Sequence, residues 1–187
     1  MGRAPGDAHP SPPNQPRRQR EKVIASAEDR ERIERHLERM PLERDALLLA
    51  MRQFGADFDR NAWQAAYEAF SAEEHNRVVQ VTGNLRALVD NAVELARFAA
   101  TLTGLRPAGR RPSTNADIEA LRADGALSGG QTYELVQLKE LCDRLRHEYA
   151  YVDADDVHTA VHSLLKLLPG FTASYVQWLT EYGVNLS

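Results

Sequence analysis

The chain has 187 residues, a formal net charge of −4 and a single cysteine, Cys142. A chain of this length typically forms one domain with a sizeable core and needs no cross-links. One cysteine excludes an internal disulfide framework and predicts a reducing, cytoplasmic compartment. The negative charge argues against nucleic-acid binding by the whole surface, but arginine outnumbers lysine and suits a local phosphate-binding cleft.

No run of the sequence approaches the roughly 20 apolar residues of a membrane-spanning helix, and the N-terminus lacks an apolar signal segment. We therefore expect no membrane-embedded part. Residues 1–20 are rich in proline and end in arginines, which predicts a disordered arm. A solvated tail is the favoured interpretation of this arm, and a contact between its basic end and RNA or a partner is the alternative.

Residues 21–39 predict a charged helix. Acidic and basic side chains interleave along it, and only Ile33 and Leu37 form an apolar stripe. This pattern is typical of a solvent-facing helix stabilised partly by ion pairs between residues four apart. We expect a helical extension over residues 21–41, ahead of the main domain.

The next two predicted helices are short. Pro41 fits the first turn of a helix that ends at Gly55, because proline lacks the N–H group that the first turn leaves unpaired. Asp59 is the expected N-cap of the following helix. That helix carries the aromatic residues Trp63, Tyr67 and Phe70.

A long helix over residues 71–102 is the clearest predicted element. Ser71 precedes Glu74 in the S-x-x-E pattern of a capping box. Apolar residues then recur at helical spacing, which predicts the spine of a helical bundle. These residues are Val78, Val81, Leu85, Leu88, Val89, Ala92, Leu95, Ala96, Ala99 and Leu102.

The region that follows predicts a loop over 104–113, a short helix over 115–123 and a turn at Asp124-Gly125. Another helix is expected over 130–147. Its buried line consists of Leu135, Leu138, Leu141 and Leu145.

The C-terminal region predicts a helix capped by Asp153 and interrupted at Pro169-Gly170, before a last segment over 171–179. No run alternates with a period of two, so no sheet is expected. The predicted fold is therefore all-α, with an antiparallel helical bundle over residues 42–187.

The segment 141–153 is the most informative part of the sequence for function. A helix with a buried apolar line ends in Arg144, Arg146 and His147, and Tyr149 and Tyr151 follow. Polar groups packed at a helix end are costly unless they are satisfied or used. The segment is therefore the candidate site.

His147-Glu148-Tyr149, the turn Asp124-Gly125-Ala126-Leu127 before the motif-bearing helix and the helix that follows at Val157 together resemble the HepT-like branch of the HEPN superfamily. In that branch an Arg, a short spacer and then His-x-Tyr lie near the end of a core helix. The resemblance covers about residues 42–182.

The resemblance implies a metal-independent endoribonuclease toxin that needs no cofactor. His147 would act as general base or acid, since imidazole titrates near neutral pH. Arg144 would stabilise the charge that develops on phosphorus, with Arg146 as a second substrate-binding cation. Tyr149 would orient His147 or bind phosphate, and the tyrosine would also accept AMP from a nucleotidyltransferase antitoxin. The family's pairing implies a homodimer with two motifs in one cleft.

The chain departs from the family where the motif normally starts with Arg-Asn, because it reads Cys142-Asp143 there. Two interpretations follow. Either Arg144, three residues before His147, replaces the lost group, or the bundle is catalytically impaired and binds RNA or protein without cutting it.

Structural roles are the alternative interpretation of these residues. His147 could cap helix carbonyls, and Tyr149 could be a packed aromatic with a bonded hydroxyl. Cys142 is expected to be a small buried hydrophobe. His158 and His162, four residues apart, could face one metal, but no further ligand accompanies them, so a surface helix is favoured.

Overall fold

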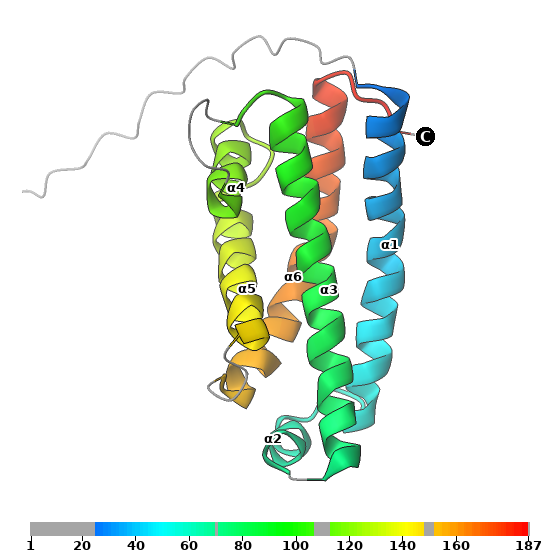
Figure 1. The fold of residues 1–187 in the computed structure, drawn as a ribbon, viewed down its shortest axis with the longest axis vertical. Coiled ribbons are helices and arrows are strands. Elements are labelled where there is room, and N and C mark those ends of the chain that lie inside the picture. The colour runs from blue at the N-terminus through cyan, green and yellow to red at the C-terminus, as the bar shows by residue number, and fades with distance from the viewer. Residues whose placement is uncertain (1–24, 70, 107–112, 148–151, 187) are drawn as a thin grey trace, which may run out of the picture.

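The computed structural model describes residues 25–69, 71–106, 113–147 and 152–186. Within these ranges the chain is helical and contains no strand, which confirms the predicted all-α bundle (Figure 1). The elements are α1 (Ala27–Met51), the short 3-10 helix η1 (Arg52–Phe54), α2 (Arg60–Glu68), α3 (Ala72–Leu102), α4 (Thr114–Ala123), α5 (Gly129–His147) and α6 (Ala154–Glu181).

The helix starts follow local capping chemistry. The three predicted N-caps are confirmed, because their side-chain oxygens accept hydrogen bonds from backbone N–H groups that the first turn leaves unpaired. These caps are Asp59 for α2, Ser71 for α3 and Asp153 for α6. Ser26 adds a cap that the sequence analysis missed: it exchanges hydrogen bonds with Asp29 in a capping box.

Two predicted helix boundaries are wrong. Pro41 lies inside α1 and Pro169 lies inside α6, where a start and an interruption were expected. A proline inside a helix removes one backbone hydrogen bond. Both prolines are on exposed faces, and buried residues flank them, Met40 before the first and Phe171 after the second. Packing on both sides of each proline therefore outweighs the local loss.

Helix α3 is the predicted spine of the bundle, and it packs against every other α-helix (Figure 1). Hydrogen bonds fix how α1 lies on it. His36 and Ala46 of α1 contact Asn91 and Asn84 of α3, and Gln53 of η1, directly after α1, contacts Gln80 of α3. The residue numbers rise on one helix as they fall on the other, so α1 and α3 run in opposite directions.

Helices α5 and α6 form the second pair and also run in opposite directions. Gln131, near the start of α5, contacts Ser174 in the second half of α6. Arg144, at the end of α5, contacts Asp156 at the start of α6. The end of α5 therefore lies beside the start of α6.

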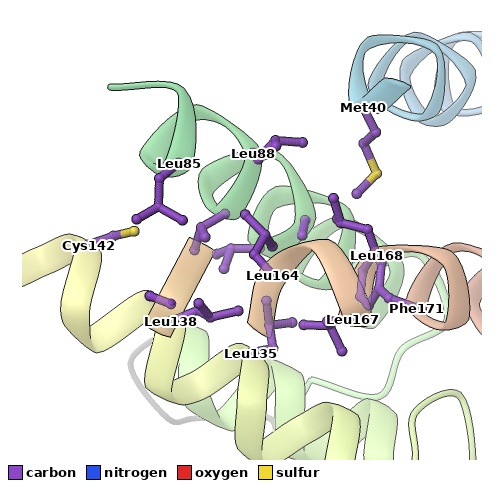
Figure 2. Packing of buried hydrophobic residues seen from close by; sticks show 14 of the residues in the cluster. Met40, Leu85, Leu88, Leu135, Leu138, Cys142, Leu164, Leu167, Leu168 and Phe171 are labelled. Atoms are coloured by element: carbon purple, nitrogen blue, oxygen red, sulfur yellow. The ribbon is translucent and has the colours of Figure 1, made fainter. Parts of the chain in front are cut away.

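The core fills the space between these pairs. Figure 2 shows Leu85 and Leu88 of α3 facing side chains of α5 and α6 in one apolar cluster. Two large buried aromatic side chains are hydrogen-bonded to backbone: the Tyr175 hydroxyl donates to the Leu95 carbonyl at 3.0 Å, and Trp63 Nε1 donates to the Ala154 carbonyl at 2.8 Å. No helix among the described residues is long and apolar enough to cross a membrane.

Some predictions concern residues outside the described ranges. These are the disordered arm at 1–20, the aromatic residue Phe70, residues 107–112 of the loop predicted over 104–113, and the motif residues Tyr149 and Tyr151.

Candidate functional site

The last turn of α5 carries three basic residues, Arg144, Arg146 and His147. The apolar line of the same helix, which includes Leu141 and Leu145, is buried in the core and turns the basic side chains outward. Cationic groups at a helix C-terminus interact favourably with the helix dipole. The sequence therefore places these residues together on the surface at one end of a rigid element.

Arg144 lies on the α6 side of this turn. Its guanidinium is 3.4 Å from the Asp156 carboxylate, and both side chains are about half exposed. The pair borders a groove of about 300 Å³ between α5 and α6 whose apolar lining includes Leu138, Leu141 and Ala160. The long, exposed contact leaves Arg144 only loosely held.

Arg146 lies on the opposite side, toward α3. It contacts Asp90 at 2.9 Å and Asp143 at 3.4 Å, and Asp143 also pairs with Lys139 at 2.5 Å. These groups line a polar cleft of about 410 Å³. The cleft's three carboxylates, Asp90, Glu94 and Asp143, match its three cations, Arg97, Lys139 and Arg146.

His147 is exposed between the two arginines. A helix turns about 100° per residue, so His147 is about 60° from Arg144 and about 100° from Arg146 around the axis. Its imidazole makes no hydrogen bond or ion pair with another residue in the described part of the chain. The structure places the predicted catalytic residues His147 and Arg144 on neighbouring parts of one surface, and the predicted substrate-binding residue Arg146 lies on the other side. Tyr149, the third predicted catalytic residue, lies outside the described residues.

Cys142 points inward from the same turn. It is 1% exposed and faces α3 near Leu85 (Figure 2), so the prediction of a small buried hydrophobe is confirmed. Burial raises the pKa of its thiol to about 12, and the nearby Asp90 carboxylate adds to the shift. The side chain is therefore a neutral thiol without nucleophilic character at physiological pH.

A second polar cluster, between α1 and α3, was not predicted. Asn91 is 6% exposed; its amide nitrogen donates to the His36 carbonyl at 3.0 Å and to the Glu43 carboxylate at 3.1 Å. Because both neighbours accept hydrogen bonds, the amide cannot be flipped, and Asn91 Oδ1 must accept from His36 Nδ1–H at 2.5 Å. The available signal was an asparagine between the apolar residues Val89 and Ala92 of the long helix.

The histidine pair on α6 differs from the surface helix that was expected. Both rings are half-buried: His158 stacks on Phe58 with ring centroids 4.8 Å apart, and His162 contacts both rings. His158 Nε2 is 2.8 Å from the Phe58 carbonyl oxygen. Partial burial lowers the pKa of His162, and the charges of His158 and Lys166 lower it further. These imidazoles thus pack the loop before α2 against α6.

No group of three or more His, Cys, Asp or Glu residues suited to a metal ion occurs among the described residues. Comparison with known proteins identifies no relative: no family model, curated protein or solved structure matches the chain.

Proposed function

We propose that the chain is a HepT-like toxin, a metal-independent endoribonuclease that works in the cytosol as a homodimer. The observation that carries the proposal is His147, an exposed imidazole with no described partner, at the end of a core helix and beside an arginine. The ring nitrogens of a histidine with a structural role are usually hydrogen-bonded to neighbouring groups. An uncommitted imidazole beside a cation supports acid–base chemistry on an anionic substrate.

The chemistry follows from what RNA cleavage requires without a metal. His147 removes the proton from a ribose 2′-hydroxyl, and the 2′-oxygen attacks the adjacent phosphorus atom. The bond from phosphorus to the 5′-oxygen then breaks, leaving a 2′,3′-cyclic phosphate, and the departing oxygen takes up a proton. Positive charge near the phosphorane-like transition state lowers the barrier, which is the role of Arg144.

Arg144 suits this role better than Arg146. The ion pair of Arg144 with Asp156 is 3.4 Å long and half exposed, and such pairs contribute only about 0–1 kcal/mol. A phosphate can therefore displace Asp156 at little cost. Arg146 shares two carboxylates, Asp90 and Asp143, so it is less free to move to a substrate.

The partners in this proposal rest on the sequence motif. A homodimer would bring a second His147 and Arg144 to the same RNA, and the exposed end of α5 is open for such pairing. Tyr149, outside the described residues, is the proposed acceptor of AMP from a nucleotidyltransferase antitoxin.

The alternative is a helical module that binds RNA or protein without cutting it. The balanced charges beside Arg146 favour this alternative, because Asp143 pairs with both Lys139 and Arg146 where the family has an asparagine. The buried neutral thiol of Cys142 also leaves α5 without the motif arginine.

The test is growth after controlled expression of the wild type, His147→Ala and a matched variant of an exposed histidine, His75→Ala, at equal protein levels. We expect the wild type and His75→Ala to arrest growth, and His147→Ala to be harmless. Equal growth of all three strains, with the wild type folded and free of modification on Tyr149, would leave the binding module as the better account.

A further inference from the structure

Arg86 of α3 differs from the other arginines of its helix. Arg77 pairs with Glu74 and Arg97 pairs with Glu94, each three residues away. The half-buried Arg86 forms no ion pair with any described residue, and its Nε atom is buried without a hydrogen-bond partner. Leaving a guanidinium nitrogen buried and unpaired costs free energy, and an anion bound by the rest of the Arg86 guanidinium would offset part of that cost.

The position of Arg86 follows from its neighbours on α5. Its charge is close enough to Cys142 to oppose the rise in the pKa of that thiol. Asp90, one turn further along α3, pairs with Arg146 on α5. Arg86, four residues before Asp90, therefore lies on the same face of α3, one turn from this ion pair and close to where α3 meets the last turn of α5.

Neither nearby group can serve as the missing counter-ion. Burial keeps Cys142 protonated and neutral, with a pKa of about 12. Asp90 is committed to Arg146 at 2.9 Å. Nε is the buried and unpaired atom of the Arg86 guanidinium, and the two terminal nitrogens, which make no hydrogen bond with a described residue, are the atoms that a ligand would contact.

The nature of the nearby residue Cys142 also fits this arrangement. A small neutral thiol at position 142 places no competing charge near the Arg86 guanidinium. An arginine at that position would place two cations together at a buried contact, which is unfavourable. The absence of the motif arginine from α5 thus avoids repulsion with the unpaired Arg86 on α3.

We propose that Arg86 binds a phosphodiester of the RNA substrate and supplies from α3 the cation that position 142 lacks on α5. The inference rests on the proposed function. The planar guanidinium presents its terminal N–H groups to one phosphate oxygen or to two, while His147, one residue after Arg146, acts on the ribose.

The experiment compares the full-length wild type with Arg86→Gln, Arg86→Lys, His147→Ala and the control Arg122→Gln, whose arginine pairs with Glu119 on the surface of α4. Single-turnover cleavage of a labelled pool of single-stranded RNA is measured in EDTA. Binding of a 2′-O-methyl analogue, which cannot be cleaved, is measured at several salt concentrations, and urea unfolding checks the fold.

We expect Arg86→Gln to cleave about 10²–10³-fold more slowly, as when one charge-stabilising donor is removed from an active site. Its binding should weaken, with the salt dependence reduced by about one charge. Arg86→Lys keeps the charge but loses the fork, so a loss of about tenfold is expected even if Arg86→Gln does not fold. Arg122→Gln should match the wild type.

The possible results distinguish the role of Arg86 from the proposed ribonuclease function. Wild-type cleavage and binding by folded Arg86 variants, with His147→Ala inactive, would overturn the role of Arg86 and leave the ribonuclease in place. If the wild type binds RNA without cutting it, the proposed ribonuclease function fails. Weaker binding by the Arg86 variants would then support phosphate binding by Arg86, and wild-type binding would overturn it. A wild type that neither cuts nor binds RNA overturns both.

Discussion

The two histidine-bearing regions that flank α3 are built differently. In the seam between α1 and α3, His36 is fixed by the buried Asn91, which also holds the Glu43 carboxylate. At the end of α5, His147 has no described partner, and its neighbour Arg144 has one long ion pair. Polar groups that satisfy one another stabilise a fold, whereas polar groups left open are available to a ligand.

This difference separates structural from functional polar residues. Asn91 has Leu88, Val89 and Ala92 as buried neighbours on its own helix, so its hydrogen bonds select one register of α1 on α3. The end of α5 contributes little to packing through its outward side chains. Mutations in the seam should therefore change stability, and mutations of the outward residues should change activity.

The largest effect on stability is expected for Cys142→Arg. It would restore the arginine of the resembled motif but place a second cation beside Arg86, at a site that is 1% exposed. An uncompensated buried charge costs about 3–5 kcal/mol, so urea unfolding should show a loss of that size. Cys142→Ala is the control and should lose much less. Full stability of Cys142→Arg would mean that position 142 reaches solvent.

A smaller loss is expected for Asn91→Leu, which keeps the branching of the side chain at Cγ but removes the hydrogen bonds to His36 and Glu43. Buried groups left unsatisfied cost about 1–3 kcal/mol in unfolding free energy. Asn84→Leu is the matched control, because Asn84 makes one exposed hydrogen bond, to Ala46 of the same seam. Equal losses for the two variants would contradict a special role for the buried amide.

Arg144→Ala and Arg146→Ala should change the unfolding free energy by less than about 1 kcal/mol each, because their ion pairs are exposed. Cleavage of RNA should fall more for Arg144→Ala than for Arg146→Ala. A larger fall in cleavage for Arg146→Ala would mean that the cation that stabilises the transition state lies on the α3 side of the turn.

The smallest effect is expected on acidification. Partial burial, together with the charges of His158 and Lys166, holds the pKa of His162 below its ordinary value of 6.5. Its contribution to stability is therefore complete above pH 6.5 and is lost as the pH falls through the lowered pKa. His162→Gln should weaken the pH dependence of thermal unfolding between pH 7 and pH 5.

Sequence reasoning located most of the helices and three of their N-caps, Asp59, Ser71 and Asp153, because capping and apolar spacing are local properties. It failed at Pro41 and Pro169, where packing on both sides of the proline continues a helix that local rules would end. It placed the candidate site at the end of α5 from the motif around His147. It missed Arg86 and the contact between His36 and Asn91, because these depend on which residues of different helices meet.

The most direct test of the account is the cleavage of single-stranded RNA by purified wild type and His147→Ala in EDTA, with urea unfolding of both. The account predicts metal-independent cleavage that falls by about 10²–10⁴-fold in the variant, with the unfolding free energy changed by less than about 0.5 kcal/mol. Cleavage at the wild-type rate by a folded His147→Ala protein would contradict the assignment of His147 as the acid–base residue.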